Sequence, residues 1–340
     1  MNIMKIAVYL PDTTPYSMKH CAWNIMAILQ EKYKIQFITF KTLSELPIVD
    51  ADIYWDPRCG GGIAPALVFR KTRKPLVLTV HGMAMFTLPL DAFYFSWKQK
   101  IVGQIKRWKE RLKWKLMQKH IAHVMTVSEY TKSELTSSVS FPKKKVTAVW
   151  NGIDHNKFKP SEKKQDTIPY FLTVISYQKK KNFERLLEAY QLLDEETRPK
   201  LIAIVKPYEP TAAIKKIKGL EIINYAISEE RIIELYQQAM ALVFVSLHEG
   251  FGLPIAEAMA CGVPVVTSNS TSCKEIAGDA AFLVNPTSTE EIKNALSKIA
   301  NDAMLRQQFS EKGIARAQQF NWEKTADGFY KIINSIINKY

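Results

Sequence analysis

The chain has 340 residues, 47% of them hydrophobic, and a formal net charge of +14. This length suits two α/β domains, and the hydrophobic content lets each domain bury a core, which excludes an intrinsically disordered chain. The four cysteines stand far apart, with neither a CxxC pair nor a metal-ligand spacing: Cys21, Cys59, Cys261 and Cys273. This pattern fits reduced thiols, so we expect a cytoplasmic protein.

Short β-branched and apolar runs alternate with helical stretches, which predicts parallel sheets with crossover helices. Residues 1–10 carry Lys5 within an apolar stretch and predict a first strand, not a signal peptide. No run of about 18 apolar residues occurs, so we expect no membrane-spanning helix. Strands are predicted at residues 5–10, 34–40, 52–55, 76–80, 123–127 and 146–150 in the first half, and at 170–176, 201–205, 221–225, 241–246, 263–267 and 281–284 in the second.

Six strands in each half predict an α/β fold of two Rossmann-like, doubly wound domains. We place the first domain at residues 1–160 and the second at 161–321, joined by the polar linker 159–167. Helices are predicted at 183–194, 228–239 and 290–300, with Asn182 and Ser228 as N-caps of the first two. Ligands of parallel sheets bind at the carboxyl ends of the strands. Five polar or glycine-containing segments that follow predicted strands should therefore line one interdomain cleft: residues 81–82, 128–131, 151–154, 179–182 and 248–254.

The excess positive charge lies in the first half of the chain. Residues 1–160 hold 25 Lys and Arg against 11 Asp and Glu, whereas residues 161–340 hold 22 of each. This split predicts an anionic partner for the first domain, such as a membrane surface, a phosphorylated acceptor or nucleic acid. A solubility bias without a partner is the alternative. No zinc site or recognised nucleic-acid motif accompanies the charge, so we expect no nucleic acid partner.

Residues 97–119 concentrate this charge, with nine basic residues and one acid, Glu110. Trp114 lies beside the lysines, and apolar residues recur at helical spacing: Ile101, Ile105, Trp108, Leu112 and Leu116. The composition is typical of a helix in the interface of an anionic membrane, which would place the protein peripherally at the inner face of the cell membrane. It also fits a crossover helix that turns its apolar stripe inward and its charges to water.

The segment HEGFGLPIAE, residues 248–257, is the most informative stretch of the chain. It follows a buried strand, turns through Gly250 and Gly252, and enters a helix with Pro254 near the first position. The missing side chains at the two glycines let a ligand approach the backbone closely. The pattern therefore predicts a ligand site at the start of this helix.

The groups available at this helix start suit a sugar nucleotide. The backbone amides of Phe251, Gly252 and Leu253 are free to bind anionic oxygens. Glu249 and Glu257 can accept hydrogen bonds from hydroxyl groups on either side of a diphosphate. A helix whose first-turn glutamate only complements the helix dipole is the alternative.

The longer segment HEGFGLPIAEAMACGVPVV, followed by EIAGDAAFLV, resembles the donor-site signature of retaining GT-B glycosyltransferases of family 4. Glu249 and Glu257 match the E-x7-E motif of that family. The resemblance covers nearly the whole chain, because further segments match in order and spacing: VSEYTKSEL (127–135), WNGIDHNKF (150–158), KNFERLLEAY (181–190) and FNW (320–322). It implies a GT-B fold and transfer of a hexosyl group from GDP-mannose or a UDP-sugar to a glycan or lipid-linked acceptor in surface polysaccharide synthesis.

The resemblance also implies roles for individual residues of the second domain. Glu257 would bind the nucleotide ribose, and Glu249 would hold hydroxyls of the transferred sugar near the reacting carbon. The backbone amides of Phe251, Gly252 and Leu253 would contact the sugar and the diphosphate.

Lysines and one histidine complete the implied site. Lys181, and Lys180 where many relatives have arginine, would neutralise the diphosphate leaving group. His81 would contact the donor sugar from the first domain, and with Glu249 it would form the catalytic pair. The C-terminal segment 322–340 would form a helix that crosses back onto the first domain.

We expect neither a metal nor a cofactor, since lysines and helix amides can stabilise the leaving group, and the sugar nucleotide is a substrate. The one Asp-x-Asp, Asp50-Ala51-Asp52, precedes a strand and is interpreted as a solvated loop. Ile175 stands where relatives have glycine, and Lys180 lacks the bidentate fork of arginine, which leaves the strength of donor binding open. Residues 11–15 replace a Gly-Gly turn of the family, so the acceptor contacts also stay open.

For the catalytic step, front-face attack assisted by the departing phosphate is favoured over Glu249 as a nucleophile.

Three alternatives to this transferase remain at the level of the sequence. A sugar-nucleotide 2-epimerase or a glycoside phosphorylase can use the same fold. A basic protein that binds nucleic acid or membrane without catalysis is the non-enzymatic alternative.

Overall fold

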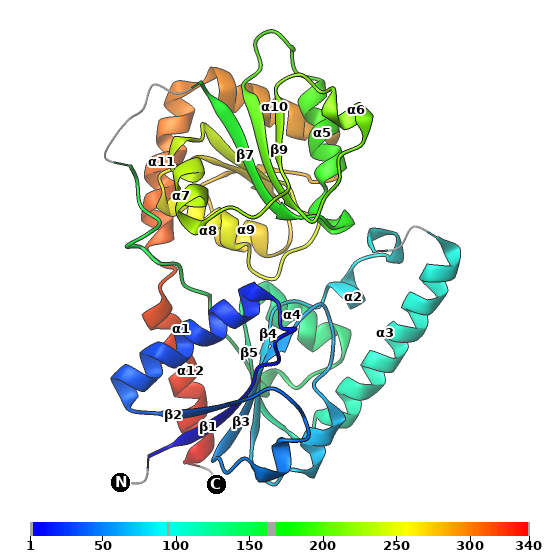
Figure 1. Ribbon diagram of the computed structural model, residues 1–340, viewed down its shortest axis with the longest axis vertical. Helices are drawn as coiled ribbons and strands as arrows, with labels where there is room; N and C mark the ends of the chain where they lie inside the picture. Colours follow the sequence, from blue (N-terminus) through cyan, green and yellow to red (C-terminus); the bar gives the residue numbers. More distant parts are fainter. Residues whose placement is uncertain (1–2, 94–95, 162–167, 339–340) are drawn as a thin grey trace. The chain divides into compact units, whose positions relative to one another are not determined.

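The computed structural model describes residues 3–93, 96–161 and 168–338 (Figure 1). The chain divides into two compact units, one formed by residues 1–152 with 321–340 and the other by residues 153–320. The division at Gly152 and Ile153 comes earlier in the chain than the predicted boundary at residue 160. Ile153 already belongs to the second unit because its N–H donates to the carbonyl of Phe320. Most of the predicted linker, residues 162–167, lies outside the described residues.

The first unit contains a parallel sheet with the strand order β2-β1-β3-β4-β5-β6. Its strands are β1 (Lys5–Tyr9), β2 (Gln36–Phe40), β3 (Ile53–Cys59), β4 (Leu76–Val80), β5 (Ile121–Thr126) and β6 (Val146–Ala148). Its α-helices are α1 (Tyr16–Tyr33), α2 (Ala84–Thr87), α3 (Trp97–Met117), α4 (Glu129–Ser138) and α12 (Trp322–Ile337). All six predicted strands are confirmed, although β2 begins after Lys34, whose left-handed backbone instead ends α1.

The two faces of this sheet are covered by different helices (Figure 1). Strand side chains alternate between the faces, so Ile6 and Val8 pack toward α1 and α12, whereas Ala7 and Tyr9 pack toward α3 and α4. Helix α12 is held by apolar packing, with the rings of Phe329 and Trp55 4.4 Å apart. The C-terminal helix therefore forms part of the core of the first unit.

The second unit contains a parallel sheet with the order β12-β11-β10-β7-β8-β9. Its strands are β7 (Tyr170–Ser176), β8 (Lys200–Lys206), β9 (Leu220–Ile223), β10 (Ala241–Phe244), β11 (Val265–Ser268) and β12 (Phe282–Val284). Its α-helices are α5 (Phe183–Gln191), α6 (Ala212–Lys215), α7 (Glu229–Gln238), α8 (Leu253–Ala260), α9 (Thr271–Ala277), α10 (Thr289–Asn301) and α11 (Ala303–Ala317). The six predicted strands and three predicted helices are confirmed, and the order reverses between β7 and β10.

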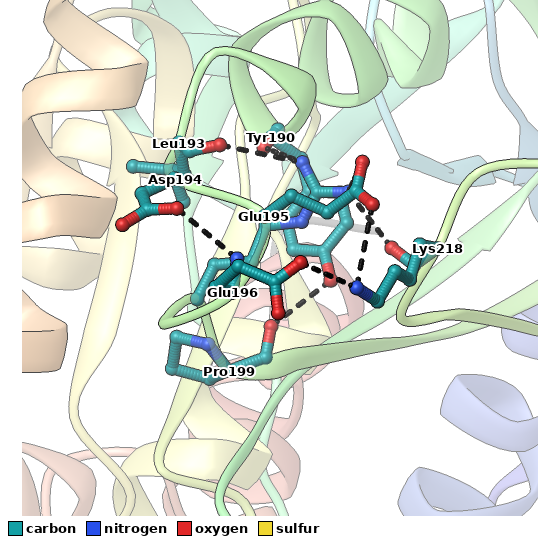
Figure 2. Close-up of polar contacts among 8 residues, drawn as sticks. Tyr190, Leu193, Asp194, Glu195, Glu196, Pro199 and Lys218 are labelled. Atoms are coloured by element: carbon teal, nitrogen blue, oxygen red, sulfur yellow. Dashed lines mark hydrogen bonds and ion pairs between the residues drawn. The ribbon is translucent and has the colours of Figure 1, made fainter.

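Helix α5 ends at Gln191, earlier than the predicted residue 194, and the side chain of Arg198 contacts its C-terminal end. One guanidinium nitrogen donates to the carbonyl of Tyr190 at 3.0 Å, and a second donates to that of Lys218 at 2.8 Å. Tyr190 and Lys218 are labelled in Figure 2. The guanidinium also lies 4.4 Å from the centre of the Tyr190 ring. A buried cation at this position complements the negative end of the helix.

Candidate active site

The loops that follow β7 and β10 meet where the strand order of the second unit reverses. In a doubly wound sheet the connections leave this point on opposite faces of the sheet, which opens a crevice for ligands at the carboxyl ends. After β7 the chain forms a short turn, Lys179–Lys181, and after β10 it enters the segment of residues 248–257. The N–H of Leu247 donates to the carbonyl of Lys180 at 2.8 Å. The fold thus joins the two loops that the sequence singled out.

An ion pair links these two loops through Lys181 and Glu249. The Lys181 Nζ lies 2.6 Å from Oε1 of Glu249, and the side chains are only 15% and 11% exposed. Burial acts to raise the pKa of the Glu249 carboxyl, but the charge and hydrogen bond of Lys181, with smaller contributions from Ser246 and Lys180, outweigh it, and the pKa lies below its ordinary value. Glu249 is therefore an anion at neutral pH, and Lys181 is a cation in a partly desolvated position.

Asn182 holds the turn in place, but not as the predicted side-chain cap of α5. Its backbone is left-handed, with φ of 65°, and its side chain makes no capping hydrogen bond. The side-chain amide instead donates to the carbonyls of Val245 and Pro286, at 3.0 and 2.7 Å. Asn182 thereby connects the loops after three strands and positions the preceding lysine. The predicted cap at Ser228 is confirmed, since its hydroxyl accepts from the N–H of Arg231.

The start of helix α8 presents backbone amides, as the glycine spacing suggests. Gly252 is the N-cap residue and has a φ of 98°, a conformation that favours glycine. Within the described residues, the N–H groups of Phe251, Gly252 and Leu253 donate no hydrogen bond to another residue. Gly250 precedes them in the same turn, and Pro254 lies within the first turn of the helix. The arrangement provides an uncompensated positive end for an anionic oxygen.

Glu257 lies in helix α8 and has a partner that the sequence did not indicate. The hydroxyl of Tyr236, on α7, donates to Oε2 of Glu257 at 3.0 Å. Burial raises the pKa of the Glu257 carboxyl to about 7, and the hydrogen bond from Tyr236 acts in the opposite direction. This carboxyl is poised to change charge near neutral pH, and in either form it can hydrogen-bond to hydroxyl groups.

The raised pKa of Glu257 predicts that the protein loses stability as the pH rises. Between the ordinary pKa of 4.5 and the folded value of about 7, the folded state binds more protons than the unfolded state, so the free energy of unfolding falls with pH. Denaturation of the wild type and Glu257→Gln over this range should show the fall in the wild type and a flatter profile in the variant. Tyr236→Phe should move the transition to higher pH, and identical profiles for all three proteins would contradict the assignment.

In the first unit, His81 follows β4 and is held in a neutral form. Its Nε2 lies 2.9 Å from the carbonyl oxygen of Pro57. A carbonyl only accepts, so Nε2 carries the proton and Nδ1 carries the lone pair. Burial lowers the pKa of His81 to about 4, which keeps the ring uncharged at neutral pH. The free Nδ1 can accept a hydrogen bond from a sugar hydroxyl.

A pocket of about 190 Å³ lies in the first unit where its strand order reverses, between β1 and β3. Thr13 and Thr14, from the segment that replaces the Gly-Gly turn, line it together with Arg58. Arg58 is held by a two-point contact with the buried Asp56, at 2.8 and 3.1 Å. The Thr14 hydroxyl is buried and has no hydrogen-bond partner among the described residues. This pocket is the candidate for acceptor contacts, which the sequence left open.

The remaining sequence expectations concern metals and the departures from the family pattern. Asp50 and Asp52 both contact Lys5, the first residue of β1, so they lie at the amino edge of the first sheet. In the described part of the chain, no cluster of three His, Cys, Asp or Glu side chains is arranged to hold a metal ion. Ile175 is a buried residue of β7 and pairs with Val205 of β8. The side chain of Ile175 is therefore part of the core that packs against the second sheet.

Two Rossmann-like units, with paired loops at the switch point of the second sheet, define the class of GT-B proteins. The family model described as Glycosyl transferases group 1 matches residues 154–316, and the model described as Glycosyltransferase Family 4 matches residues 47–157. The chain is 30% identical over 269 residues to O-antigen chain mannosyltransferase B of Escherichia coli, covering 73% of this chain and 67% of that protein. The chain belongs to family 4 of the GT-B glycosyltransferases, as its motifs predicted, and it is a glycosyltransferase.

Two further similarities agree with this membership. The serotype-specific mannosyltransferase WbdA of Escherichia coli is 31% identical over 180 residues, which cover 49% of this chain and 22% of that larger protein. Anabaena HepE, whose crystal structure contains UDP and glucose, has a TM-score of 0.71 and 16% identity, over 98% of this chain and 100% of that chain. The second similarity shows the shared fold.

Proposed function

We propose that the enzyme transfers a mannosyl or related hexosyl group, with retention of configuration, from GDP-mannose or a UDP-sugar to a glycan or lipid-linked acceptor. The names of the mannosyltransferases to which the chain is similar favour mannose and surface polysaccharide synthesis. The ion pair between Lys181 and Glu249 at the switch point carries this proposal. This ion pair places a cation that can bind a diphosphate beside a carboxylate that can accept hydrogen bonds from sugar hydroxyls.

The proposed role of each site residue follows from its charge and its hydrogen-bonding groups. Breaking the bond between the anomeric carbon and the diphosphate leaves the electron pair on a phosphate oxygen. Lys181, Lys180 and the amides at the start of α8 would stabilise this charge, so no metal ion is needed. The acceptor oxygen bonds to the anomeric carbon from the same face, and its proton passes to the departing phosphate. Glu249 would orient sugar hydroxyls and His81 would accept a hydrogen bond from one of them.

Donor selection with chelator present tests this function. Purified protein is incubated with GDP-mannose, UDP-glucose or TDP-glucose, with mannosylated acceptor and EDTA, and nucleotide release is followed. We expect release from GDP-mannose above the other donors and an α-configured product by NMR. Loss of activity in EDTA would contradict metal independence, and a β-configured product would contradict retention. Incubation without acceptor, or with inorganic phosphate in its place, separates a transferase from an epimerase and a phosphorylase.

A further inference from the structure

Helix α3 exposes an apolar stripe along its whole length. Trp97 and Trp108 are 68% and 63% exposed, respectively. Five further apolar residues of the helix are exposed: Ile101, Val102, Ile105, Leu112 and Leu116. Most of these positions are three or four residues apart, and at 3.6 residues per turn they share one side of the helix. The alternative in which this stripe turns inward is wrong.

The opposite side of α3 attaches the helix to the first unit. Its buried residues are Gly103, Glu110, Trp114 and Met117. Glu110 accepts a hydrogen bond from the N–H of Ala64 at 2.9 Å, and the indole of Trp114 donates to the carbonyl of Gly62 at 3.0 Å. Trp114 is thus a core residue, not a neighbour of the surface lysines. Because the helix is anchored through this other side, its apolar stripe remains without a partner in the described structure.

Basic residues border the stripe on both sides. Helical geometry places Lys98, Lys106 and Lys109 along one border and Lys100 and Arg111 along the other. Arg107 is turned toward the protein, where its guanidinium donates to the carbonyl of Leu88 at 2.8 Å. Lys100 pairs with Asp91, and Lys113 pairs with Glu110, the one acid of the helix. Lys106, Lys109, Lys115 and Lys119 form no ion pair within the described residues. The surface formed by α3 is therefore apolar at its centre and strongly cationic around it.

We propose that α3 lies in the interface of an anionic lipid bilayer, with its apolar stripe among the acyl chains and its basic borders at the headgroups. A helix of 21 residues is about 31 Å long, so it can lie along a membrane surface with both tryptophans at the boundary between headgroups and acyl chains. Charge complementarity favours the anionic lipids of a cytoplasmic leaflet. Nucleic acid would satisfy the lysines and leave the stripe in water. Among the described residues, no helix is long and apolar enough to cross a membrane.

Docking through α3 also bears on the acceptor. The buried side of the helix holds Gly62 and Ala64, and Ala64 lines the pocket at the switch point of the first sheet. A docked helix would therefore fix this pocket relative to the bilayer and present it to a lipid-linked acceptor. The docking surface stands on its own observations, and only this role in acceptor presentation rests on the proposed transferase function.

Vesicle flotation tests the docking surface with the full chain. Vesicles of phosphatidylcholine alone are compared with vesicles that also contain phosphatidylglycerol. We expect binding at least about tenfold stronger to the anionic vesicles, weakening with salt. The double variant Trp97→Ser/Trp108→Ser should lose at least about tenfold of this binding, as should Lys106→Gln/Lys109→Gln. The control Tyr225→Ser/Met304→Ser removes exposed apolar side chains from the second unit and should bind like the wild type.

Two results would overturn the docking proposal. One is absence of binding to either kind of vesicle, and the other is equal binding by the wild type and the tryptophan variant. Binding of duplex DNA in preference to anionic vesicles, unaffected by the tryptophan substitutions, would favour the nucleic-acid alternative. Thermal-shift binding of GDP and UDP by the same variants separates the two proposals. Vesicle binding without nucleotide binding would contradict the transferase function alone, and the reverse result would contradict docking alone.

Discussion

Replacing Glu249 by glutamine is expected to lower sugar transfer by about 100-fold to 1,000-fold, the cost of removing one preorganised electrostatic group from a reaction centre. Glutamine keeps the size of the side chain but loses the charge that pairs with Lys181 across 2.6 Å. Glutamine accepts hydrogen bonds from sugar hydroxyls less strongly than a carboxylate does. It also leaves Lys181, whose side chain is 15% exposed, without its counter-charge. The measurement is kcat and KM with the preferred donor, beside a denaturation curve.

A matched control for this substitution lies in the same unit. Glu234→Gln removes an exposed glutamate that pairs with Arg231 on the helix surface, and it should leave transfer within about twofold of the wild type. Unchanged turnover in Glu249→Gln would contradict the proposed role of Glu249. A covalent sugar adduct on the wild-type carboxylate would show a double displacement and contradict front-face attack.

Replacing Lys181 by methionine is expected to lower kcat by a similar factor, about 100-fold to 1,000-fold, with a smaller effect on KM. Negative charge grows on the diphosphate as its bond to the sugar breaks, so a lysine beside it acts mainly in the transition state. Lys181 also lowers the pKa of Glu249, and its loss should move the acidic limb of the pH–rate profile to higher pH. A purely structural role for Lys181 would not move this limb.

The neighbouring turn supplies the control for Lys181. Lys179→Met removes an exposed lysine from the same short turn and should retain most of the activity. If the two variants lost equal activity, a general electrostatic effect of the lysine cluster would replace the specific role of Lys181.

The ion pair between Lys181 and Glu249 also makes the stability of the protein depend on pH. Because the folded pKa of Glu249 is depressed, its ion pair stabilises the fold at neutral pH, and this contribution is lost as the pH falls.

Local sequence patterns alone predicted the strands, the doubly wound sheets and the loops that carry the site. Period-two and apolar runs are local signals, since each residue's own neighbours decide whether it suits a strand. The glycines and proline of residues 248–257 similarly determine a turn and a helix start within a few residues. The family resemblance rests on the same local segments, so Glu249, Glu257, Lys181 and His81 could all be named before the structure.

Only the tertiary structure decided which of these groups meet and which side of each helix is covered. Lys181 pairs with Glu249, and Tyr236 with Glu257, through strand order and helix packing that no local period encodes. The Asn182 side chain left its expected capping role because the carbonyls of Val245 and Pro286 come within reach in the folded sheet. Helix α3 was predicted from its spacing, yet its apolar stripe faces outward because Glu110 and Trp114 find backbone partners on the other side. Periodicity shows that a helix has an apolar side, and long-range packing alone determines whether the protein buries that side or leaves it for a partner.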